Sequence, residues 1–154
     1  VFLEVANSLY REYKDSGRRV VCIAGYVWDS LERHDRAIEM LLEAEDAGIL
    51  DLSGQTQLVE YLRHEKRYTE TIVLLERLSK LYPDTMTYRG QLIEAYHFAK
   101  RPEKASETLK AAETHFHAGG RWSEGNVATL ASSLLTAEML PRAAELFEEA
   151  VTLR

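Results

Sequence analysis

Two pairs of a carboxylate and an imidazole are the residues whose type and spacing could bind a metal ion. Glu60 and His64 lie four residues apart, and Glu94 and His97 lie three apart. On a helix, either spacing puts both side chains on one face, and such pairs on facing helices build di-metal sites. Those sites need a dry interior and further carboxylates, so a solvated polar face with Glu60 and His64 paired locally explains these residues more simply. We therefore predict no metal site.

The sequence contains no catalytic motif. It has neither a glycine-rich phosphate loop nor a nucleophile motif. The single cysteine, Cys22, lies near Arg18 and Arg19, which could activate a thiol. A lone cysteine more commonly fills a small space in an apolar core, so we expect Cys22 to be buried. We predict no catalytic residue, no cofactor and no enzymatic activity.

Composition narrows the classes of partner. The 154 residues include 19 Lys and Arg against 25 Asp and Glu, which gives a formal net charge of −6. Nucleic-acid binding depends largely on basic side chains that displace counterions, so this acidic balance argues against it. With 45% apolar residues and aromatic residues spread along the chain, the protein should fold rather than remain disordered.

Membrane insertion and secretion are not predicted. The longest apolar stretch covers nine residues, Val20 to Trp28, whereas a membrane-spanning helix needs about 20. The first residues lack a basic region followed by an apolar one, so they do not form a signal peptide. One cysteine excludes an intrachain disulfide, which agrees with the cytosol without establishing the compartment.

Helices are the elements that must position these side chains. Only 8 Gly and 3 Pro occur, and apolar residues recur at the i, i+3, i+4 and i+7 spacing of amphipathic helices. Helices are predicted to begin near Arg18, Asp35, Ser53, Arg67, Thr85, Pro102, Ser123 and Pro141. Ser53, Thr85 and Ser123 suit N-cap positions, and the two prolines suit the first turn of a helix.

The helical pattern repeats along the chain. Ala37, Thr71 and Ala105 are each 34 residues apart, and Ala143 follows 38 residues later. Other apolar positions keep the same phase, and a run containing Gly119 and Gly120 accounts for the longer last interval. A fixed period of this length is typical of solenoids built from stacked repeats.

A 34-residue helix-turn-helix unit with a small residue where two helices cross resembles the tetratricopeptide repeat (TPR) family. The first block carries the clearest match to the family pattern, through Val21, Ala24, Gly25, Trp28, Ala37 and Leu41, and Pro83 occupies the closing-proline position of the second. The resemblance implies an all-α fold of antiparallel helical pairs stacked into a right-handed α-solenoid, with Gly25 at a helix crossing. It divides the chain into a second helix of a preceding repeat (residues 1–17), four repeats (18–51, 52–85, 86–119 and 120–154) and one solenoid domain. Because the array begins in mid-repeat, we expect it to be a fragment of a longer protein.

The resemblance also implies where a partner binds. First helices of such repeats line a concave groove, and this extended surface usually carries the function. The family's groove positions correspond here to Arg19, Ile23, Tyr26, Gln57, Glu60, Arg63, His64, Gln91, Glu94, His97 and Phe98. The cationic clamp by which chaperone-binding members hold a peptide carboxylate is absent. We predict a scaffold or adaptor domain that binds a helix or extended protein segment with apolar anchors and a basic side chain.

Two alternatives belong to other functional classes. The segment could be a spacer or self-assembly module for a catalytic or membrane domain elsewhere in the parent chain, because apolar residues near both ends favour end-to-end homo-association. Among them are Phe2 and Leu3 at one end and Leu146, Phe147 and Val151 at the other. RNA binding by a related helical repeat conflicts with the acidic charge.

Overall fold

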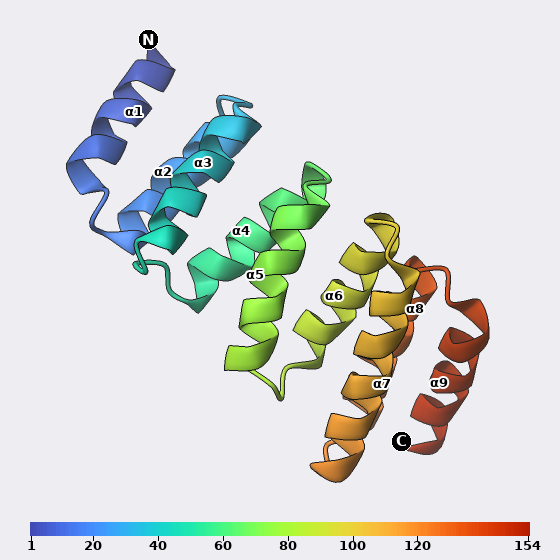
Figure 1. The fold of residues 1–154 in the computed structure, drawn as a ribbon. Helices are drawn as coiled ribbons and strands as arrows, with labels where there is room; N and C mark the ends of the chain where they lie inside the picture. The colour runs from blue at the N-terminus through green and yellow to red at the C-terminus, as the bar shows by residue number, and fades with distance from the viewer. The chain divides into compact units, whose positions relative to one another are not determined.

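The structure, a computed structural model, describes residues 1–154 and contains nine α-helices and no strands. In chain order the helices are α1 (Phe2–Tyr13), α2 (Gly17–Asp29), α3 (His34–Asp46), α4 (Leu52–His64), α5 (Tyr68–Leu81), α6 (Met86–Phe98), α7 (Pro102–Ala118), α8 (Glu124–Thr136) and α9 (Leu140–Thr152) (Figure 1). No helix combines the length and the apolar character that a membrane span would require.

The predicted helix starts lie within a residue of the observed ones, but one predicted cap is wrong. Asp51, rather than Ser53, caps α4, where its carboxylate accepts the backbone N–H of Gly54 at 2.9 Å. Ser123 caps α8 as expected, whereas Thr85 caps α6 without a side-chain hydrogen bond. Asp51 therefore begins the helix two residues before the predicted cap, since its side chain reaches an unpaired N–H group of the first turn.

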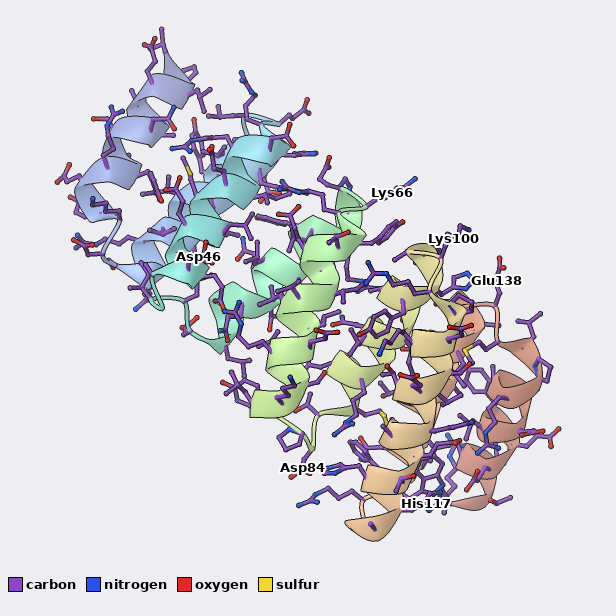
Figure 2. All side chains as sticks on the ribbon, viewed as in Figure 1. Asp46, Lys66, Asp84, Lys100, His117 and Glu138 are labelled. Atoms are coloured by element: carbon purple, nitrogen blue, oxygen red, sulfur yellow. The ribbon has the colours of Figure 1, made fainter.

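A recurrent backbone conformation marks the turns after α2, α4, α6 and α8. Lys66, Lys100 and Glu138, which Figure 2 labels at these turns, have positive φ angles of 56°, 61° and 57°. Glu32 has the same conformation at 51°. These residues are 34, 34 and 38 residues apart, the spacing of the sequence repeat. A left-handed residue after a helix lets the next N–H bond back to the last turn, as the N–H of Arg101 does to the carbonyl of Tyr96 at 2.8 Å.

The chain forms two compact units, of which the first comprises Val1–Arg67. In this unit α2 contacts α1, α3 and α4, and α3 also contacts α4. The helices enclose fully buried apolar side chains, which include Val20, Ile38, Leu41 and Leu58. The hydroxyl of Tyr10 donates a hydrogen bond to Glu43, which links α1 to α3. Burial and this bond raise the pKa of Tyr10 above its usual value.

The second unit comprises Tyr68–Arg154. Here α6 contacts α5, α7 and α8, and α8 packs against α9. Its core includes the fully buried Leu75, Ile93, Phe116 and Leu130. Leu146, which we expected at an exposed end, is also fully buried, since it lies on the face of α9 that packs against α8.

One further expectation about a single residue is wrong, and a second residue is less closely packed than its position suggests. Cys22 is exposed rather than buried. Gly25 is half-buried, and a Cβ built there would lie 3.6 Å from the side-chain nitrogen of Gln57, an ordinary contact. Position 25 therefore does not require glycine. The close approaches occur instead at Gly17, where a Cβ would meet the Ile49 carbonyl oxygen at 2.0 Å, and at Gly90.

Candidate protein-interaction surface

An apolar hollow lies between α1 and α2 in the first unit. It consists of two adjoining depressions of about 440 and 340 Å³, which share Leu9, Cys22 and Ile23 as lining residues. Helix α1 also supplies Phe2, Val5, Ala6 and Tyr13, and α2 also supplies Arg18, Arg19 and Tyr26. The α1 side chains recur at helical spacing, so one stripe of this helix faces the hollow.

Large apolar side chains in this hollow are open to solvent. Phe2 is 69% exposed, Val5 53% and Tyr26 44%. The basic end of the hollow holds Arg18 and Arg19, and the guanidinium of Arg19 lies 4.2 Å from the centroid of the Tyr13 ring. A contiguous apolar surface rimmed by charge is typical of a site that binds another protein.

Three of the predicted binding residues, Arg19, Ile23 and Tyr26, line this hollow together. Sequence reasoning missed the contribution of α1, although Phe2, Val5 and Leu9 follow the i, i+3, i+7 spacing of an apolar stripe. The signal was therefore present in the sequence. Only the position of α1 against α2 distinguishes this stripe from the one that enters the core.

A stack of rings from α2, α3 and α4 contacts two more of the predicted residues, Gln57 and His64. The indole of Trp28 lies between the Tyr61 ring, at 3.8 Å between centroids, and the His34 ring, at 4.0 Å. The hydroxyl of Tyr61 accepts a hydrogen bond from the side-chain nitrogen of Gln57 at 2.6 Å. The edge of the His64 ring meets Trp28, with centroids 5.3 Å apart.

Polar partners in this region differ from the local pairing predicted for Glu60 and His64. Glu60 accepts a hydrogen bond from Arg63 at 3.1 Å. His64 instead contacts Glu65, with 2.9 Å between its Nδ1 and the carboxylate, and His34 contacts the same oxygen at 2.8 Å. The bonds to His64 and His34 lower the pKa of the Glu65 carboxyl.

The remaining predicted residues lie on α6 in the second unit. Phe98 is 40% exposed and stacks on Tyr68, with ring centroids 5.5 Å apart. His97 meets the edge of the Phe98 ring and lies 3.9 Å from the carboxylate of Glu138. Gln91 is half-buried, and Glu94 is buried, so its carboxylate is less accessible to a partner than we predicted.

Comparison with solved structures identifies the fold. The match to the structure of MamA 41-end from Desulfovibrio magneticus RS-1 covers 98% of this chain and 82% of the MamA chain, with a TM-score of 0.64 and 16% sequence identity. The match to a second structure, MamA MSR-1 C2, covers 86% of this chain and 76% of that MamA chain, with a TM-score of 0.55 and 19% sequence identity. MamA is a TPR-repeat protein, so the chain has the all-α fold of TPR-like solenoids. No known protein-family profile and no curated protein sequence matches the chain.

Proposed function

We propose that this chain is a protein-interaction scaffold, part of a larger multi-domain protein, that binds a helical segment of a partner. The observation that carries the proposal is the exposed apolar hollow between α1 and α2, in which Arg19, Ile23 and Tyr26 meet the apolar stripe of α1. Within each unit taken by itself, the predicted binding residues on α4 and on α6 would provide further, mostly polar, contacts for a partner. Such a role needs no catalytic group.

Comparison of the repeats with one another supports a helix as the occupant. Helix α2 contacts both α3 and α4, and α6 contacts both α7 and α8. In the phase of the repeat, α1 and α2 correspond to α3 and α4, and to α7 and α8. In both other cases that place is taken by the helix that precedes the pair along the chain. The hollow therefore has the position and the apolar lining that suit a helix with residues at i, i+3, i+4 and i+7.

Charge complementarity defines one end of the partner helix. Arg18 and Arg19 are both exposed, so an acidic side chain beside them would form ion pairs. Such pairs would orient the helix more than they would tighten its binding. The proposed occupant is therefore an amphipathic helix with an apolar stripe and an acidic residue at one end.

Site-specific cross-linking tests this proposal. Because Cys22 is the only cysteine and lines the hollow, a photoreactive maleimide attached to it reports what the hollow holds. We expect the cross-linked partner peptide, mapped by mass spectrometry in a cell extract, to be an amphipathic helix that also binds as a synthetic peptide. The double variant Val5→Lys and Tyr26→Lys should lose both the cross-link in the extract and the binding of the synthetic peptide, since it puts two charges among the apolar contacts.

A matched control carries the same added charge elsewhere. Val73 and Leu81 of α5 are 55% and 60% exposed and lie outside the hollow, so Val73→Lys with Leu81→Lys should leave both cross-linking and peptide binding unchanged. Equal capture by the two double variants, or captured segments without helical amphipathicity, would refute the proposed site.

A second candidate function, self-assembly as a spacer module, is favoured by an observation on α9. Leu140, Phe147 and Val151 are 55%, 39% and 68% exposed, and their spacing puts them on one face of the helix. A second copy of the chain would cover this face. Sedimentation should then show concentration-dependent association that Phe147→Lys with Val151→Lys abolishes, whereas a monomer at every concentration would exclude it.

A further inference from the structure

We propose that His34, His64 and Glu65 form a binding site for a divalent transition-metal ion of the Zn²⁺ type. The three side chains come from the start of α3, the end of α4 and the residue after α4. One ligand atom from each lies within 4.8 Å of the other two. This set differs from the pairs Glu60–His64 and Glu94–His97 that the sequence suggested. It shares only His64 with them, and its other imidazole, that of His34, comes from a different helix.

The distances suit a small ion after a modest adjustment. The Nδ1 atoms of His34 and His64 lie 2.8 and 2.9 Å from the same Oε1 of Glu65. With metal–ligand bonds of about 2.0–2.2 Å, tetrahedral coordination places neighbouring ligand atoms about 3.3 Å apart. Each contact therefore needs to lengthen by about 0.5 Å to admit the ion. In the metal-bound form each ring would carry its hydrogen on Nε2 and offer Nδ1 as the ligand.

Neighbouring aromatic rings hold one imidazole in place before a metal arrives. The His34 ring is stacked on Trp28 with an interplanar angle of 14°, and the other face of Trp28 is stacked on Tyr61. The His64 ring stands nearly perpendicular to His34, at 89°, with centroids 5.5 Å apart. Such orientation by surrounding groups lowers the entropy cost of binding and raises metal affinity.

The charge around the site favours a cation. His34 and Glu65 line a cleft of about 650 Å³ whose other charged residues are Glu32, Arg33, Asp35, Arg36, Glu39, Glu43, Asp46 and Arg67. The lining thus contains six carboxylates against three guanidinium groups. One of these guanidiniums, that of Arg36, forms an ion pair with Glu39 at 2.5 Å. The cleft is therefore net negative.

The donor set selects the class of ion. Mg²⁺ and Ca²⁺ prefer oxygen ligands throughout, whereas two imidazole nitrogens and one carboxylate match Zn²⁺ and its neighbours in the first transition series. Three protein ligands leave a fourth position open to water or to a ligand atom from a partner. Because the ligands join the start of α3 to the end of α4, the bound ion would stabilise the first unit.

Isothermal titration of the untagged full chain with Zn²⁺ tests the proposal. We expect one ion per chain and a higher melting temperature with Zn²⁺ than without it. His64→Ala removes one of the three ligands and should weaken the binding of Zn²⁺ by at least about tenfold. Since the His64 side chain is 64% exposed, this variant should fold normally. Glu65→Gln keeps the size of the side chain and one acceptor oxygen but removes its charge, and should weaken binding in the same way.

His115 provides the matched control. Its Nε2 lies 3.0 Å from Asp84, so it is also a surface imidazole beside a carboxylate, but without a second histidine. His115→Ala should leave the affinity for Zn²⁺ unchanged. An equal loss of affinity in His115→Ala and His64→Ala would show nonspecific binding to surface histidines and overturn the proposal, as would no binding at about 1 mM Zn²⁺.

Fluorescence gives an independent measurement. The chain has two tryptophans, so in a Trp122→Phe background the signal comes from Trp28, whose ring contacts both imidazoles. Paramagnetic Co²⁺ bound at the site should quench it in the variant with intact ligands and not in the same variant carrying His64→Ala. Quenching that persists without His64 would place the ion elsewhere.

Discussion

Gly90 of α6 and Ser133 of α8 approach each other so closely that no side chain fits at position 90. A Cβ built on Gly90 would lie 2.3 Å from the hydroxyl oxygen of Ser133 and 3.0 Å from its Cβ. Ser133 is itself buried, at 6% exposure, so it has little room to move. This contact fixes the separation of two helices in the core of the second unit.

Gly90→Ala should therefore destabilise the protein by about 1–3 kcal/mol, as overpacking in a core does. Gly125→Ala, at a helical position with no atom within 4 Å of the new Cβ, should be neutral or stabilise by up to about 1 kcal/mol. Urea denaturation measures both changes. Adding Ser133→Gly to Gly90→Ala should recover part of the loss, and strict additivity of the two substitutions would contradict the close contact.

Asp51→Ala should lower stability by about 1 kcal/mol, because the carboxylate caps the first turn of α4 through the N–H of Gly54. Ser53→Ala should have little effect, since Ser53 lies inside the helix and is exposed. Thermal melts of both variants compare the two directly. Equal losses would mean that the helix does not begin where the structure places it.

Alkaline pH should weaken the contact between α5 and α6. Burial raises the pKa of Tyr96 to about 12, helped by the hydrogen bond that its hydroxyl donates to Glu76. Because the pKa is about 10 in the unfolded chain, the stabilisation is complete below about pH 10 and is lost as the pH rises toward 12. Chemical denaturation at about pH 9 and about pH 11 should show a steeper loss for the parent than for Tyr96→Phe. Parallel losses would contradict the raised pKa.

Cys22 should react with a thiol reagent in the folded protein, because its side chain is exposed in the hollow between α1 and α2. The rate in buffer should approach the rate measured in denaturant. Occupation of the hollow by a helical peptide should slow the reaction, whereas Zn²⁺ at the proposed metal site should not change it. Reaction only after unfolding would restore the expectation that Cys22 fills a core.

The helices and the repeat are predictable from the sequence because they depend on residues close together in the chain. The apolar spacing along residues 20–28 and 37–44 is a property of each helix, so the helices and their starts follow from it. The same holds for the 34-residue period, which reappears in the left-handed turns at Lys66 and Lys100. Competition between nearby caps is less predictable, since Asp51 and Ser53 differ only in which one reaches a free N–H.

The sequence by itself determined the helical class and the repeat. It also predicted Arg19, Ile23 and Tyr26 as binding residues, and the structure brings these three to the same hollow. Only the tertiary structure decided which stripe of α1 stays exposed and that Glu65 lies between His34 and His64. The physical reason is the range of the interactions. Helix formation depends on residues three and four apart, whereas these contacts depend on side chains that packing brings together from different helices.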